Sequence, residues 1–228
     1  MRSRVLGGIA LAAMLVVGLT AAGCGSSSAG AKSAAKLMPE LQAAARSATS
    51  VHMAGLVKSG GQTVTINMSF DGDSVAGTLQ LNGASFELLS LKGKTYIKLN
   101  ASFLKLAKAP AIACATICGR YVELPAASAR QITGSLSMQQ LVNQVFSDKN
   151  TRQGAASGCT FSPATVNGQS VLQCSYRGNT VDVAAHGKPY PVYFTGPHGQ
   201  HIAFSEWNSA TLPPVPPANL VISLSKLS

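Results

Sequence analysis

The chain has 228 residues, a length that suits one domain or at most two small ones with a substantial buried core. Only 11% of its residues are charged and 46% are hydrophobic, which excludes a charged disordered chain and disfavours a coiled coil. The 18 basic and 8 acidic residues give a net charge of +10, so anionic lipids, polymers and acidic surfaces are electrostatically favoured neighbours.

The start of the chain has the pattern of an export signal. Two arginines precede an uncharged apolar run over residues 5–22, and the small residue Gly23 stands directly before Cys24. This order predicts a signal peptide over residues 1–23. The context of Cys24 resembles a bacterial lipobox, except that Ala21 occupies the usual leucine position three residues before the cysteine. An ordinary cleavage site nearby and an uncleaved membrane helix are the alternatives.

A segment rich in Gly, Ser and Ala follows Cys24. We expect residues 24–35 to be the lipidated cysteine and a flexible tether spanning about 20 Å, with a single folded domain over residues 36–228. A diacylglyceryl group on Cys24 would anchor the protein to the extracytoplasmic face of the cell membrane. The basic bias persists after removal of residues 1–23, because 16 minus 8 leaves +8.

Four further cysteines remain in the exported chain. An even number of cysteines in an oxidising compartment favours disulfides, and three pairings are possible. We favour Cys114 with Cys118 and Cys159 with Cys174, because each pair is close in sequence. The second pair also flanks a hairpin signal at Asn167-Gly168.

The first half of the folded part changes from helical to strand periodicity. Apolar residues at three- and four-residue spacing over residues 36–49 predict one amphipathic helix beginning near Pro39. From residue 51 onward apolar and polar residues alternate, as on strands with one dry face. Short turn signals such as Asn82-Gly83 separate these strands, so we expect an antiparallel meander rather than parallel strands with long crossovers.

The second half is less regular and then returns to strands. Around a cysteine-bearing loop we expect helices over residues 101–108, 126–132 and 137–147, with a short extended piece at 121–124. Strands are expected over residues 159–166, 169–176, 179–185, 190–195, 201–207 and 220–224. Pro163 should lie at an edge or bulge, because it cannot donate a ladder hydrogen bond.

The balance of elements suggests an internal hollow. Roughly ten strands and about three helices imply either two facing sheets or one curved sheet that is incompletely covered. In the second case an apolar concavity of the kind that binds greasy ligands remains. The candidate lining residues are Val64, Ile66, Met68, Phe70, Leu79, Leu81, Phe86, Leu88, Ile97 and Leu99. The alternative is that these side chains simply pack a core.

Several features together resemble a known family. They are the signal and Cys24, the Ala-rich helix leading into SVHMAG at residues 50–55, the meander, and YPV at 190–192 with IAFSEW at 202–207 before a Pro-rich tail. They are similar to the LppX/LprG-type lipoproteins of actinobacteria, which are related in fold to the LolA lipoprotein carrier. The resemblance implies an α+β fold: a strongly curved antiparallel half-barrel, covered on its concave side by a few helices around an acyl-chain cavity. It also implies binding or transport of lipid, with an envelope transport partner. The four extra cysteines depart from the family pattern.

Other functions are less well supported. Thiol redox or copper delivery is the sharpest alternative, because Cys114 and Cys118 have a C-x-x-x-C spacing used by some copper chaperones, with His198 and His201 as conceivable ligands. A structural disulfide explains the pair more simply. The chain has no G-x-S-x-G motif, and its scattered basic residues lack the aromatic platform of single-strand nucleic-acid binding. We therefore expect a non-catalytic protein without cofactor or nucleic-acid partner. An envelope scaffold or interaction protein is the remaining alternative.

Overall fold

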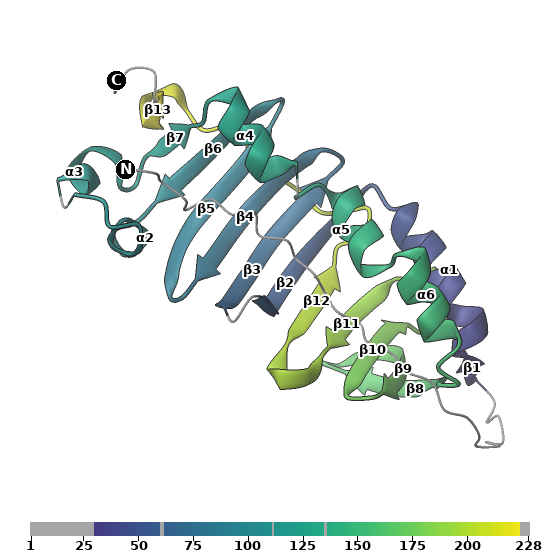
Figure 1. The fold of residues 1–228 in the computed structure, drawn as a ribbon. Coiled ribbons are helices and arrows are strands. Elements are labelled where there is room, and N and C mark those ends of the chain that lie inside the picture. Colours follow the sequence, from purple (N-terminus) through teal and green to yellow (C-terminus); the bar gives the residue numbers. More distant parts are fainter. Residues whose placement is uncertain (1–29, 60–61, 111, 135, 224–228) are drawn as a thin grey trace.

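The computed structural model describes residues 30–59, 62–110, 112–134 and 136–223. Within this part of the chain, strands form one open 13-stranded sheet in the order β1-β8-β9-β10-β11-β12-β2-β3-β4-β5-β6-β7-β13 (Figure 1). The sheet is mostly antiparallel and carries a few helices, which confirms the α+β class and the open, half-barrel type of sheet. In Figure 1 the helices α4, α5, α6 and α1 follow one another along one face, while α2 and α3 project at the β7 end.

The first half of the sheet is the expected meander. Its strands are β2 (Ser50–Ser59), β3 (Gln62–Asp71), β4 (Ser74–Leu81), β5 (Ala84–Leu91) and β6 (Lys94–Leu99). The turn at Asn82 and Gly83 has φ of 49° and 81°, the positive values that a two-residue hairpin turn requires. The alternation of apolar and polar residues therefore predicted the meander well, because strands joined by a two-residue turn pair with each other.

The remaining strands extend the sheet on both sides of the meander. They are β1 (Lys32–Ser33), β7 (Tyr121–Glu123), β8 (Thr160–Val166), β9 (Gln169–Tyr176), β10 (Asn179–Ala184), β11 (Pro191–Thr195), β12 (His201–Ser205) and β13 (Val221–Ser223). β1 pairs only with Thr160 and Phe161, so Pro163 lies on an otherwise unpaired edge of β8, as expected.

The helices are more numerous than the sequence indicated. Among the described residues they are α1 (Ala34–Arg46), α2 (Ala101–Leu106), α3 (Ala113–Ile117), α4 (Ala126–Thr133), α5 (Met138–Val145) and α6 (Asp148–Ala155), with 3-10 turns at Pro197–Gly199 and Ala218–Leu220. Ser137 caps α5 by accepting a hydrogen bond from the Gln140 N–H, the arrangement expected for that serine. The turn α3 and the whole of α6 were not expected.

Two expectations about the ends of the folded part were wrong. The first helix begins at Ala34 rather than near Pro39, because Ala34, Leu37 and Leu41 all bury on one face and hold Pro39 inside the helix. Of the tether expected over 24–35, Lys32 and Ser33 pair with β8 and residues 34–35 begin α1, while residues 24–29 lie outside the described part of the chain. At the other end β13 pairs with β7 in parallel, because the chain between β12 and β13 is long enough to cross the sheet.

The two faces of the sheet differ in what covers them. On one face, hereafter the covered face, buried side chains from β2–β5, β8–β10 and β12 pack in one cluster with α1 and α5. On the other face a smaller cluster contains Ala76, Leu89, Leu91 and Tyr96. Leu212 and Val221 pack against this second cluster, so the Pro-rich tail lies along the face opposite the helices.

Candidate ligand-binding hollow

The ten side chains predicted to line a cavity share the covered face. Cross-strand partners lie on the same face of a sheet, and the register pairs Val64 with Leu81, Ile66 with Leu79, and Leu88 with Ile97. Six of the ten are buried, namely Val64, Ile66, Met68, Phe70, Leu79 and Leu88. The other four, Leu81, Phe86, Ile97 and Leu99, are half-buried. None of the ten lines either of the two hollows described below, and nine of them, all but Leu99, belong to the main apolar cluster or pack against it.

The larger hollow lies over the other half of the sheet, beneath α6. Its volume is about 70 Å³. It is bounded by α1, α6, the end of α5 and strands β8 to β12. The lining residues are Ala34, Met38, Phe146, Thr151, Gly154, Ser157, Phe161, Cys174, Tyr176, Asn179, Val181, Pro191, Tyr193, Phe194 and Phe204.

The position of α6 leaves this space open. α6 packs mainly on α1 rather than on the strands below it. The close contact occurs at Gly154, where a Cβ atom would come within 2.7 Å of Met38 Cε. A glycine at this point therefore lets α6 approach α1 closely while its inner side faces the strands across the hollow.

Polar contacts at the surface fasten α6 to α1. The Gln42 side chain donates hydrogen bonds to the Phe146 carbonyl oxygen, at 2.7 Å, and to Asp148 Oδ1, at 2.8 Å. Arg46 Nη2 lies 3.0 Å from the same Asp148 oxygen. The Gln42 hydrogen bond and the Arg46 charge lower the pKa of Asp148. The contacts to Asp148 are solvent-exposed, and exposed ion pairs contribute little to stability, whereas the hydrogen bond to Phe146 is partly buried.

The hollow is apolar and carries no charged side chain of Lys, Arg, Asp, Glu or His. Its most deeply buried polar group is the Thr151 hydroxyl, which has no hydrogen-bond partner among the described residues. A buried hydroxyl without a partner is unfavourable, so a ligand atom that could hydrogen-bond there would be stabilised. The lining thus suits an uncharged, mainly hydrocarbon ligand with at most a small polar group.

A second, smaller hollow adjoins the first. It measures about 10 Å³ and is lined by Val51, Met53, Met138, Leu141, Val142, Phe146, Phe204 and Trp207. Phe146 and Phe204 line both hollows, and their ring centroids lie 6.2 Å apart. This pair of rings therefore separates the two spaces, and a movement of Phe146 away from Phe204 would join them.

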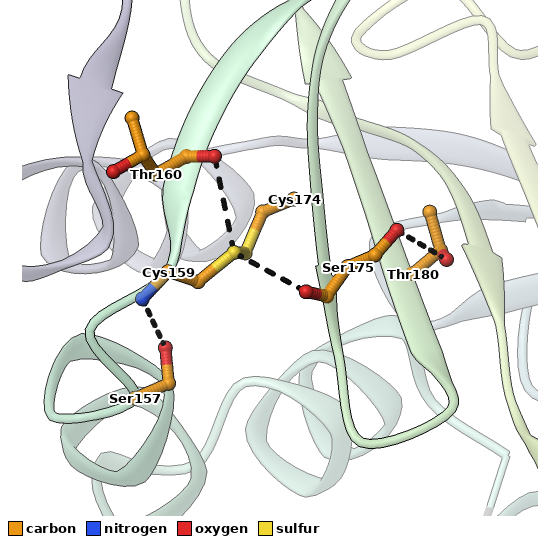
Figure 2. Close-up of a disulfide and its surroundings, with 6 residues drawn as sticks. All are labelled: Ser157, Cys159, Thr160, Cys174, Ser175 and Thr180. Carbon is orange, nitrogen blue, oxygen red and sulfur yellow. Dashed lines mark hydrogen bonds between the residues drawn. A yellow bond between two sulfur atoms is a disulfide. The ribbon is translucent and has the colours of Figure 1, made fainter. Parts of the chain in front are cut away.

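The disulfide Cys159–Cys174 borders the larger hollow, as Figure 2 shows in close-up. It joins the start of β8 to β9, with the two Cα atoms 6.1 Å apart. The Cys159 N–H donates to Ser157 Oγ at 3.2 Å, which orders the loop between α6 and β8. The bridge thereby fixes the strand end to which α6 is connected.

The other disulfide joins Cys114 and Cys118 in and beside α3. Both thiols are consumed by the bond, so neither is available as a thiolate ligand in this state. His201 Nδ1 lies 3.1 Å from the Gly199 carbonyl oxygen, in the turn that contains His198. No three metal-ligating side chains gather anywhere in the described residues. The geometry thus gives the copper interpretation no support.

The lining residues were missed for identifiable reasons. Val181, Phe194 and Phe204 lie on strands that the sequence predicted, and their alternation could have placed them on the covered face. Thr151 and Gly154 could not be chosen, because the polar sequence of α6 contains no large apolar side chain that would mark a buried face. Cys24 and the expected signal lie outside the described residues. Among the described helices, none has the length and apolar character needed to cross a bilayer.

An open, mostly antiparallel sheet with a helical cover over one apolar face is the LolA-like class of fold. The crystal structure of LprF from Mycobacterium bovis has this fold and superposes on the present chain with a TM-score of 0.53. The match covers 80% of this chain and 96% of LprF at 13% identity. LprF belongs to the LppX/LprG group, so the resemblance expected from the sequence is confirmed at the level of the fold.

Other comparisons add little. Two structures of Pseudomonas aeruginosa MucB with MucA match with TM-scores of 0.27 and 0.26, at 18% and 15% identity. They cover 82% and 77% of this chain, and 59% and 54% of the matched chains. Likeness this weak carries no argument. No family model and no curated protein matches the sequence.

Proposed function

We propose that the protein is a non-catalytic envelope lipoprotein that reversibly binds a lipid or another apolar ligand in the hollow beneath α6. The observation that carries the proposal is the lining of this hollow, which is almost wholly apolar and contains no charged group. A concave apolar site with few polar groups is the usual form of a small-molecule site. The LprF-like fold supports the proposal.

Ligand binding on this proposal requires the cover to move. At about 70 Å³ the hollow is smaller than the roughly 150 Å³ of an apolar cavity that holds one benzene. Displacement of α6 and Phe146 would join the two hollows into a longer trough. The exposed contacts of Gln42 and Arg46 resist this displacement only weakly. Burial of an alkyl chain, at about 0.8 kcal/mol per CH₂, can outweigh them.

The proposal places the protein at the extracytoplasmic face of the membrane, anchored through a diacylglyceryl group on Cys24. A carrier of this kind must receive and release its cargo, so a transport partner in the envelope forms part of the proposal. We expect Cys24→Ser to shift the protein from the membrane to the soluble fraction of a cell lysate, because the acyl chains are the proposed anchor. A Cys24→Ser variant that remains fully membrane-bound would contradict the anchor.

The hollow itself is tested by filling it. Val181 lies on β10 and faces the hollow, so Val181→Phe places a ring in the space that the ligand would occupy. Thr180→Phe is the matched control, because Thr180 is the neighbouring residue on β10 and does not line the hollow. Titration of the purified protein with a fluorescent fatty acid measures the dissociation constant of each variant.

We expect Val181→Phe to weaken binding at least about tenfold, which corresponds to about 1.4 kcal/mol, and Thr180→Phe to bind as the parent does. Native mass spectrometry of the parent should also show a co-purified apolar molecule. If the parent neither contains nor takes up any lipid, the binding proposal is wrong. The result would then favour the alternative of an envelope scaffold or interaction protein. Equal binding by the parent and Val181→Phe would place the ligand elsewhere.

A further inference from the structure

The segment between β6 and β7 forms a lobe at one end of the sheet, visible as the projecting α2 and α3 in Figure 1. We call residues 101–110 and 112–120 the α2–α3 lobe. Four large hydrophobic side chains are exposed in the described part of the chain, and two of them belong to this lobe. Ile112 is 79% exposed and Leu106 is 43% exposed.

The lobe is internally ordered, so its exposed side chains are held outward. The Asn100 side chain caps α2 by accepting a hydrogen bond from the Phe103 N–H at 2.9 Å. Phe103 packs edge-on against Phe86 of the sheet with ring centroids 5.0 Å apart, and Leu104 is buried. The Cys114–Cys118 disulfide closes α3. The inward side chains fix the lobe to the sheet, while Leu106 and Ile112 remain in water.

The same lobe carries positive charge without compensation. Lys105, Lys108 and Arg120 lie in or beside it, and the sequence from 101 to 120 contains no Asp or Glu. None of the three forms an ion pair with a carboxylate among the described residues. The lysines of the adjacent β6 differ, because Lys94 pairs with Glu123 and Lys98 pairs with Glu87. Unpaired cations are thus found beside the exposed apolar side chains.

We propose that the α2–α3 lobe is a membrane-docking site that binds the surface of an anionic lipid bilayer. Leu106 and Ile112 would enter the headgroup region, and the three cations would contact lipid phosphates. Apolar side chains flanked by Lys and Arg are the pattern of interfacial membrane binding. A bilayer fits better than a protein partner, because a stable protein interface buries about 800 Å² per partner and two separate apolar side chains offer far less.

This docking site is independent of the hollow and has a consequence for orientation. Strand order places the lobe beside β7, at the opposite edge of the sheet from β1, where the folded part of the chain begins. With strands about 4.8 Å apart, these edges are separated by more than 50 Å along the sheet. A protein anchored near β1 and docked through the lobe would therefore lie lengthwise along the membrane.

Hydrogen exchange of the full exported chain, reconstituted in vesicles, tests the proposal. The vesicles contain phosphatidylcholine alone or phosphatidylcholine with phosphatidylglycerol, and exchange is followed in peptides that cover Leu106 and Ile112. We expect slower exchange of these peptides only on the anionic vesicles. The double variant Lys105→Gln/Lys108→Gln should lower the membrane affinity of the lobe by about fivefold for each cation removed, and its peptides should be less protected from exchange. Added salt should reduce the protection in the same way. Ile112→Ser should also weaken it.

Matched controls are available on other surfaces. Lys188 is exposed, and Val215 is 40% exposed in the Pro-rich tail, so Lys188→Gln and Val215→Ser make comparable chemical changes outside the lobe. Both controls should leave the protection of the lobe unchanged. Equal exchange on both kinds of vesicle, or equal effects of lobe and control variants, would overturn the proposal. Protection that appears only when envelope proteins are added would also overturn it and point to a protein partner.

Discussion

Asp182 is a carboxylate buried within the sheet, with 1% of its surface exposed. Gln173 Nε2 donates a hydrogen bond to Asp182 Oδ1 at 2.8 Å, which favours the ionised form. Burial disfavours that form more strongly, and the net result is a raised pKa for Asp182. The folded protein therefore binds this proton more tightly than the unfolded chain does.

This raised pKa gives a pH dependence of stability. Between the ordinary Asp pKa of about 4 and the raised folded value, the folded state holds more protons, so the free energy of unfolding falls as pH rises through this window. Above this pH window the stabilisation contributed by the proton on Asp182 is completely lost. We expect Asp182→Asn, which keeps the acceptor for Gln173, to be more stable than the parent at neutral pH. The difference should shrink as the pH falls through the window.

Urea unfolding at a series of pH values measures this effect. Asp73→Asn is the control, because Asp73 lies exposed in the turn before β4 and its replacement should change stability little. If the parent were more stable than Asp182→Asn at every pH, burial of Asp182 would not raise the pKa of its carboxyl group, and the prediction would be wrong.

At the residue scale the sequence predicted interactions between residues that are close together in the chain. The pairing of Cys159 with Cys174 followed from a hairpin turn, and the structure contains that disulfide. The lining residue Thr151 could not be predicted, because its burial depends on how α6 packs against α1. Side chains that meet only through tertiary packing leave no local pattern.

At the element scale the strands were predicted well and the helices less well. Alternation and turn signals located β3, β4 and β5 closely, because each strand pairs with a neighbour a few residues away. The helix α6 was missed because it is polar and packs through Gly154, a residue that sequence patterns associate with helix ends. The parallel pairing of β13 with β7 was missed because nothing local specifies a partner 100 residues away.

The missed helix changes where a ligand would bind. The side chains expected to line a hollow lie on the covered face of β3 to β6, where most of them are buried, and none of them borders the hollow beneath α6. The unexpected α6 stands over β8 to β12 and leaves space beneath it. The placement of the helices decides which part of the apolar face is filled, so alternation along the strands alone could not locate the hollow beneath α6.

At the scale of the whole molecule, two separate features would serve the proposed envelope role. One is the apolar hollow beneath α6, and the other is the basic, apolar-tipped α2–α3 lobe at the far end of the sheet. The movement that opens the hollow would involve α6 and Phe146, which lie on the opposite half of the sheet from the lobe. Docking at a membrane and opening of the hollow can therefore be examined separately.

Photo-crosslinking with a fatty acid that carries a diazirine on its tail measures most directly where a ligand lies. After irradiation and digestion, peptide mass spectrometry identifies the labelled segments. The proposed hollow predicts labels on peptides that contain Met38, Phe161 and Phe194, and competition by unmodified fatty acid should remove them. Labels confined to β3–β6, or no competed label in any peptide, would contradict the claim that the hollow beneath α6 is a ligand site.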